Sequence, residues 1–318
     1  MLTSRSRRRE GCLAILIVFL FSSTGTVYSS EKVISLQQAE LIGELIFQNE
    51  CAGKDANLLH WNDGENFPSL GIGHFIWYPA HYNGSFDESF PKLLIFLQGR
   101  GIALPDWFQT LPGLHAPWRA KGDFLRALEK GELDSLKTFL METKSEQAVF
   151  LVERFNQSIS KILEAVPLGC RQPILQKLFL MLKANDGLYP LIDYVNFNGE
   201  GILESERYNG EGWGLLQVLE TMRVPAEESN VVPEFVKAVE RILERRVSNS
   251  PPERNEKRWL PGWKIRIYTY LTVQDPTKPV EAQPLQEILL STVAANIQLT
   301  ENANLPVDDV IPPPTIAR

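Results

Sequence analysis

Apolar residues recur at helical spacing along much of the chain, in the i, i+3, i+4 pattern that is typical of amphipathic helices. The first such stretch follows a capping box of Ser35 and Gln38 and predicts a helix that ends near Glu50. Its apolar positions are Leu41, Ile42, Leu45 and Ile46. The chain therefore opens its folded part with a helix.

Three more helices are predicted further along. A second capping box, Thr143 with Glu146, precedes a long amphipathic pattern that ends before Pro167 and Gly169. Pro173 stands at the expected start of the next helix, and a later one covers residues 235–243. Their apolar positions include Val149, Val152, Phe155, Ile159, Ile162 and Leu163, then Ile174, Leu175, Leu178, Phe179 and Leu182, then Phe235, Val236, Val239, Ile242 and Leu243. The chain is expected to be mainly helical.

Between Cys51 and Tyr82 the helical pattern gives way to Gly, Asn, Asp and aromatic residues, which favour turns. Leu70, Ile72 and Phe75 in a glycine-punctuated run predict a small β-hairpin. The expected fold class is mainly α (α+β), one helical domain over residues 31–273. Residues 274–318 are rich in Pro, Ala, Asn and Thr and are expected to form a largely disordered tail, with at most a short helix around 285–293.

Residues 1–30 have the order of a secretory signal peptide. A basic run at 5–9 precedes an uncharged apolar run at 13–21, and small residues follow at Ser29 and Ser30. The apolar run is much shorter than the roughly 20 residues that a bilayer-spanning helix needs. We therefore expect cleavage and export, to the periplasm or the exterior, with no stable membrane span afterwards.

Charge and cysteine content narrow the partners further. The whole chain carries −7, and removing the four Arg and one Glu of residues 1–30, a net +3, leaves −10. Such an acidic protein is not expected to bind nucleic acid. Cys51 and Cys170 remain as an even pair, which allows a disulfide in an oxidising compartment. Four histidines without ligand spacing predict no metal site, and no nucleotide-binding motif indicates a cofactor.

The densest chemistry lies in residues 49–74, where Glu50, Asp63 and Glu65 surround a glycine-bounded turn. Cleavage of a glycosidic bond needs a protonated carboxyl group to donate to the leaving oxygen. A second carboxylate usually holds a water molecule or stabilises the transition state. A Glu at a helix end that faces a loop carboxylate fits these two roles.

Asp63, Ser69 and the Gly-Ile-Gly-His run at 71–74 follow Glu50 in an order that resembles the phage-type lysozymes of the lysozyme-like superfamily. The resemblance covers about 40 residues, from the first helix to Trp77, and implies a lysozyme-like helical domain. It also implies that Glu50 is the general acid and that Asp63 and Ser69 position the attacking water. Glu50 and Asp63 are several residues further apart than in the phage enzymes, so Glu65 remains an alternative second carboxylate. His74 is expected either to fix Glu50 or the loop by hydrogen bonding, or to be an ordinary polar residue.

A second polar cluster lies between Tyr194 and Leu219, where a glycine turn leads into a helix. Its residue types suit sugar hydroxyls and pyranose faces, which makes it a candidate substrate-binding wall; the alternative is a plain helix start with its turn. The candidate substrate-binding residues are His74, Asn209, Glu211, Trp213 and Gln217. Downstream, a basic patch of Lys257, Arg258, Lys264 and Arg266 surrounds Trp259 and Trp263, and is expected to be a solvated face or a contact for an anionic polymer.

The sequence thus predicts an exported glycoside hydrolase of lysozyme type, acting on peptidoglycan or a related β-linked aminosugar polymer, without cofactor or metal. Three alternatives stay open. They are a non-catalytic envelope binding or scaffold protein, a chitosanase-like hydrolase, and a lytic transglycosylase, which needs only the acid.

Overall fold

The computed structural model describes residues 36–84, 86–111, 113–184, 186–272 and 293. The described part is mainly helical with two small antiparallel sheets, which confirms the expected fold class. The predicted signal peptide lies outside the described residues, as does the predicted tail apart from Val293, which is buried. Within the described residues no helix has the length and apolar content needed to cross a bilayer.

The helices are α1 (Leu36–Cys51), α2 (Phe90–Gly99), α3 (Lys121–Glu129), α4 (Asp134–Glu142), α5 (Lys144–Ala165), α6 (Arg171–Lys183), α7 (Leu188–Asn198), α8 (Leu215–Thr221), α9 (Val231–Asn249) and α10 (Leu260–Tyr268). Short 3-10 turns are η1 (Asp55–Leu58), η2 (Asp106–Thr110), η3 (Leu168–Cys170), η4 (Glu204–Glu206), η5 (Glu228–Asn230), η6 (Pro252–Arg254), η7 (Glu256–Arg258) and η8 (Thr269–Leu271). The predicted helices correspond to α1, α5, α6 and α9.

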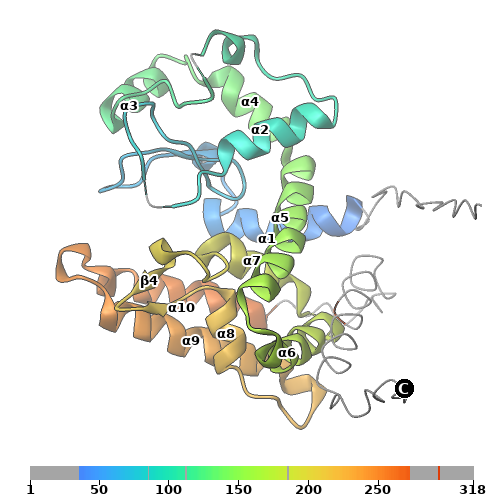
Figure 1. The fold of residues 1–318 in the computed structure, drawn as a ribbon. Helices are drawn as coiled ribbons and strands as arrows, with labels where there is room; N and C mark the ends of the chain where they lie inside the picture. Colours follow the sequence, from blue (N-terminus) through green and yellow to red (C-terminus); the bar gives the residue numbers. More distant parts are fainter. Residues whose placement is uncertain (1–35, 85, 112, 185, 273–292, 294–318) are drawn as a thin grey trace, which may run out of the picture. The chain divides into compact units, whose positions relative to one another are not determined.

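Helix α5 crosses α1, and the two are packed extensively against each other (Figure 1). Gly43 of α1 permits this approach, because a Cβ atom at that position would stand 2.4 Å from Cβ of Ala148. The start of α5 differs from the predicted capping box. Thr143 is buried and its hydroxyl donates to the carbonyl of Phe139, 2.8 Å away at the end of α4, so it caps no amide of α5.

Three two-residue strands form the first sheet, in the order β1 (Leu59–His60), β2 (Ser69–Leu70) and β3 (Phe75–Ile76). The predicted hairpin is therefore β2–β3, and β1 adds a third strand. The connecting turn is anchored on α5, since the amide of Ile72 donates to Oε1 of Gln147 at 2.9 Å. Gly71 has φ +73, and a Cβ there would meet the same amide oxygen at 2.4 Å, so only glycine fits the turn.

An aromatic core supports this sheet from the side of α2. Trp77, fully buried, contacts the rings of Phe90, Phe108 and Trp118 at centroid distances of 4.8, 5.8 and 5.7 Å. Its indole donates to the carbonyl of Leu114 at 2.8 Å. Trp61, Trp77 and Trp118 are thus packing residues, because each of these side chains is buried and contributes a large apolar area.

The second half of the chain packs α9 against α8 and α10, and α7 against α5 and α8. A second sheet, β4 (Arg207–Tyr208) with β5 (Glu211–Gly212), contacts α9. Almost all of α7 is buried, including the polar side chain of Asp193. A buried carboxylate needs a compensating charge, and for Asp193 this charge comes from Arg266 in α10.

Replacing Gly43 by Ala tests the contact between α1 and α5. Alanine favours a helix by up to about 1 kcal/mol over glycine, but the clash with Ala148 outweighs this, and we expect a net loss of about 1–3 kcal/mol in unfolding free energy. Gly262→Ala in α10, where a Cβ meets nothing within 4 Å, is the matched control and should be neutral or stabilising. Urea unfolding measures both, and equal effects of the two changes would contradict the packing argument.

Candidate active site

Glu50 lies in the last turn of α1, with 14 % of its side chain exposed. Its two carboxyl oxygens have different surroundings. Oε1 accepts from Nη2 of Arg266 at 2.8 Å and from Nδ2 of Asn196 at 3.1 Å. Oε2 faces Nδ1 of His74 at 3.6 Å. The carboxyl group is thus held in one orientation by residues from α10, α7 and the sheet turn.

Arg266 is shared between two carboxylates. Its guanidinium binds both oxygens of Asp193, at 2.9 and 2.7 Å, and lies over the ring of Phe197 at 4.3 Å. The hydroxyl of Tyr270 donates to Oδ2 of Asp193 at 2.5 Å. Burial disfavours the charge on Arg266, but the two carboxylates outweigh it and hold its pKa above the ordinary value. Because Asp193 already balances the charge of Arg266, Glu50 accepts one N–H hydrogen bond from a guanidinium group that is paired with another carboxylate.

A second set of contacts ties the end of α1 to α7 and to η8, the turn that directly follows α10. Nδ2 of Asn49 donates to the hydroxyl of Tyr189 at 2.7 Å, and Oγ1 of Thr269 lies 3.2 Å from that hydroxyl. Thr269 in turn donates to the carbonyl of Arg266 at 2.7 Å. The backbone that carries the guanidinium is therefore fixed next to α1.

His74 follows the Gly-Ile-Gly turn with φ +46, a left-handed conformation that is uncommon outside glycine. Its Nε2 lies 3.1 Å from the carbonyl oxygen of Asn57, and its ring stacks parallel to that of His60 at 5.5 Å. Burial lowers the pKa of His74, although the charge of Glu50 opposes this. His74 therefore bonds the loop through Asn57 and lies beside the Glu50 carboxyl group at 3.6 Å, which is longer than a hydrogen bond.

The two candidates for a second carboxylate differ in environment. Asp63 is fully exposed and pairs with Nζ of Lys121 at 2.5 Å, which lowers its pKa. Burial raises the pKa of Glu65, whose Oε2 accepts from Nδ2 of Asn62 at 3.0 Å. Oδ1 of Asn62 lies 2.9 Å from Nε2 of His60. Glu65 thus holds Asn62, which in turn contacts His60, whereas Asp63 is open to solvent.

Ser69 lies in β2, opposite His60 in β1 and Ile76 in β3. Directly opposed residues of a sheet share a face, so Ser69 is on the face that carries His60. Its side chain is buried, with 4 % exposed.

The second polar cluster mostly supports the fold. Gln217 is buried, accepts from the amide of Gly214 and donates to the carbonyl of Gly201. Trp213 is also buried and covers the guanidinium of Arg246 at 4.4 Å. The remaining two residues are exposed at the β4–β5 hairpin, where Asn209 takes φ +53 and Glu211 pairs with Arg245.

Both described cysteines are free thiols, so the disulfide that the sequence allows is not formed. Cys51 is buried, which raises its thiol pKa to about 12, and Cys170 is exposed. In the part of the chain that the structure describes, no three His, Cys, Asp or Glu side chains are grouped as metal ligands.

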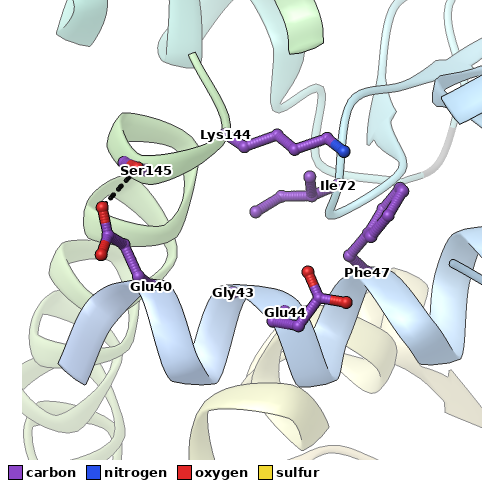
Figure 2. A pocket seen from close by; sticks show the side chains of 7 residues that line it. All are labelled: Glu40, Gly43, Glu44, Phe47, Ile72, Lys144 and Ser145. Atoms are coloured by element: carbon purple, nitrogen blue, oxygen red, sulfur yellow. Dashed lines mark hydrogen bonds between the residues drawn. The ribbon is translucent and has the colours of Figure 1, made fainter. Parts of the chain in front are cut away.

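A small pocket of about 150 Å³ opens beside α1 (Figure 2), and Glu50 is not among the residues that line it. Figure 2 shows Glu40 bonded to Ser145 on one side and Lys144 extended above Phe47 on the other. Lys144 also pairs with Asp55 at 2.5 Å. These contacts hold the start of α5 against α1 and η1.

Sequence reasoning missed the partners of Glu50. The sequence places Arg266 in a basic patch, but the structure divides this patch. Lys264 pairs with two glutamates, Glu240 and Glu244, whereas Arg266 is largely buried. The available signal was spacing, since Arg266 and Tyr270, both partners of Asp193, are four residues apart in the sequence. Asp193, inside an otherwise apolar run, was the second signal. Comparisons with protein-family models, curated proteins and solved structures find no match to this chain.

Arg266→Met should lower the free energy of unfolding by about 3–5 kcal/mol, because it leaves the carboxylate of Asp193 buried without its cation. Lys264→Met, two residues away in α10, removes only partly exposed pairs and should cost at most about 1 kcal/mol. Urea unfolding at pH 7 compares the two. Similar losses would show that the buried pair has no special weight.

Proposed function

We propose that this chain is an exported glycoside hydrolase of lysozyme type, with Glu50 as the acid and peptidoglycan or a related β-linked aminosugar polymer as substrate. One observation carries the proposal: Glu50 is nearly buried, and its carboxyl group is held in one direction because Arg266 and Asn196 both donate to Oε1. A carboxyl group in this state suits proton donation to a leaving oxygen. The resemblance of residues 50–74 to phage-type lysozymes and the signal-like residues 1–30 add the reaction class and the location.

The environments of the two carboxylates favour Asp63 over Glu65 as the second group. The ion pair with Lys121 lowers the pKa of Asp63 and keeps it ionised, as a group that holds a water molecule or balances developing positive charge must be. Burial raises the pKa of Glu65, and its bond to Asn62 already occupies it. Glu50 is nearly buried and Asp63 is exposed, and two carboxyl groups in such contrasting environments are the pattern expected of an acid and its ionised partner.

The atoms balance in a single displacement. Glu50 gives its Oε2 proton to the glycosidic oxygen, and the electron pair of the C–O bond moves to that oxygen. Water attacks the sugar carbon and gives its proton to Asp63. Solvent then takes the proton from Asp63 and returns one to Glu50, so the enzyme is unchanged.

An exposed aromatic surface is available for a sugar. Trp259, 42 % exposed, is covered on one face by the guanidinium of Arg258 at 4.5 Å. Arg258 also contributes to lowering the pKa of Asp63, so its charge acts at the same part of the surface. Indole faces bind sugar rings, and a fixed cation suits the carboxylates of a peptide-bearing polymer.

Glu50→Gln should reduce the release of soluble muropeptides from purified peptidoglycan by at least about 10²-fold, since the amide cannot donate a proton as an acid does. The control is Glu44→Gln on the exposed side of α1, which should leave activity unchanged. Circular dichroism and unfolding confirm that the variants fold. Release of equal amounts by Glu50→Gln and wild type would rule out Glu50 as the acid, and no release by folded wild type would favour the binding role.

Asp63→Asn should lower hydrolysis by about 10²-fold or more, while Glu65→Gln should have a much smaller effect. Lys121→Met tests the ionisation of Asp63 without changing Asp63 itself, because it removes the charge that lowers the pKa of Asp63. That pKa then rises, so activity should be lost at a higher pH as the solution is acidified.

Product analysis distinguishes the outcomes for Asp63. Reducing-end sugars indicate hydrolysis, and internally cyclised anhydro products that persist in Asp63→Asn indicate a transglycosylase. A larger loss in Glu65→Gln than in Asp63→Asn would reverse the assignment.

A further inference from the structure

The turn that carries Asp63 is closed from the inside by Glu65. Nε1 of Trp61 donates to the backbone carbonyl of Glu65 at 2.8 Å, and Nδ2 of Asn62 donates to its carboxyl Oε2 at 3.0 Å. Asp63 and Gly64 lie between these residues at the tip of the turn, where Gly64 takes a φ of +84 that glycine adopts freely. The tip is therefore bounded on both sides by residues that are bonded to each other.

The amide of Asn62 joins this turn to the first sheet. While Nδ2 bonds Glu65, Oδ1 lies 2.9 Å from Nε2 of His60 in β1. An ionised carboxyl group only accepts, so the nitrogen of the amide faces Glu65 and its oxygen faces an N–H group of His60. Both ends of one side chain are used, and the direction of the amide follows from its partners.

The sheet is joined in turn to the end of α1, which carries Glu50. The ring of His60 stacks on that of His74 at 5.5 Å, and Nε2 of His74 lies 3.1 Å from the carbonyl oxygen of Asn57. Nδ2 of Asn57 donates to the carbonyl of Cys51, directly after Glu50, at 2.8 Å. A continuous set of contacts thus runs from the turn to the last residue of α1.

We propose that Glu65 is the positioning residue of Asp63. Its carboxyl group holds Asn62, Asn62 holds the turn against His60, and the tip is thereby kept at a fixed place relative to Glu50. Glu65 itself touches no substrate in this role. The inference deepens the proposed glycosidase function and rests on it for the effect on turnover, whereas the fixed turn is a property of the fold and is measured without substrate.

The two acidic side chains of the turn take opposite places. That of Asp63 is 99 % exposed, while Glu65 is partly buried, and burial raises the pKa of Glu65. The hydrogen bond from Asn62 acts in the opposite direction and lowers that pKa. A carboxyl group withdrawn from water needs such a donor. The bond to Asn62 therefore compensates the burial of Glu65 and keeps its side chain turned inward.

Lys121 of α3 holds the same tip from the outside. Its Nζ lies 2.5 Å from Oδ1 of Asp63, and this pair lowers the pKa of Asp63. An exposed ion pair restrains a turn weakly, because solvent screens the charges and two side chains lose conformational freedom. The inner bonds therefore place the tip where Lys121 reaches it. When they are removed, the pair should weaken and the pKa of Asp63 should rise.

The position of Asp63 matters for the proposed reaction because a water molecule has to fit between two carboxyl groups. The separation of such groups decides whether water can attack in a single displacement. A shift of about 1 Å in a catalytic group lowers turnover by up to about 10²-fold. A loosened turn should therefore lower kcat and leave KM nearly unchanged, since Glu65 contributes no contact to the substrate.

Carboxyl carbon resonances of the purified full chain, followed over pH, test the turn without substrate. Glu65→Gln and Glu65→Leu both remove the charge of Glu65, but only glutamine keeps an oxygen that accepts from Asn62. We expect the pKa of Asp63 to stay low in wild type and Glu65→Gln, and to rise toward the ordinary value in Glu65→Leu and in Asn62→Ala. Asn66→Ala, at an exposed neighbour, is the matched control and should leave that pKa unchanged. A pKa of Asp63 that ignores both Glu65→Leu and Asn62→Ala would overturn the proposal.

Turnover gives the second readout. Glu65→Leu and Asn62→Ala should each lower kcat for muropeptide release by about tenfold with KM within about twofold of wild type, while Glu65→Gln should stay close to wild type. The double variant Glu65→Leu/Asn62→Ala should lose no more than either single variant, because both changes break the same link. Circular dichroism and urea unfolding confirm that each variant folds. Fully additive losses would contradict the shared link, and a loss in Glu65→Gln as large as in Glu65→Leu would show that Glu65 acts through its charge.

The outcomes separate the two proposals. If the pKa of Asp63 responds as expected but folded wild type releases no muropeptides, the glycosidase proposal fails and the positioning of Asp63 stands. If wild type releases muropeptides but Glu65→Leu and Asn62→Ala change neither the pKa of Asp63 nor kcat, the positioning role fails and the glycosidase proposal stands.

Discussion

One guanidinium holds together three segments that are far apart in the chain. Arg266 donates to both carboxylate oxygens of Asp193 in α7 and to one carboxyl oxygen of Glu50 in α1. Because an unpaired buried charge costs several kcal/mol, the ends of α1, α7 and α10 are constrained to stay in contact. The pair that stabilises the packing therefore also fixes the direction of the Glu50 carboxyl group, and a change in either partner affects both.

The charge of Arg266 is divided unequally between the two carboxyl groups that it contacts. Asp193 takes the larger share of Arg266, and Tyr270 completes its hydrogen bonding. Glu50 gains an oriented bond without the full attraction of an unpaired charge. Asp63 is in the opposite situation, exposed to solvent and paired with Lys121 alone. The two carboxyl groups thus have contrasting surroundings, one nearly buried among several partners and the other open to solvent.

Local patterns were sufficient to predict the helix that carries Glu50, the long α5 and the glycine turn before His74, because these depend on residues close in sequence. The partners of Glu50 come from residues 193, 196 and 266, and no local pattern records which distant segments will meet. Gln217 shows the converse difficulty: its type suits a sugar hydroxyl, yet the fold uses its amide to bond Gly201 and Gly214. Residue type alone does not distinguish a polar group that serves the backbone from one that serves a ligand.

The separation of 216 residues between Glu50 and Arg266 has a consequence for folding. Bringing distant segments together carries a loop-closure cost that only the finished contacts repay, so such contacts tend to form late. Until α10 docks, Asp193 has no cation and Glu50 is not oriented. The surroundings of Glu50 are therefore completed only when α10, near the end of the described chain, has docked, and a chain cut before residue 266 retains the sequence 49–74 without the contact that orients Glu50.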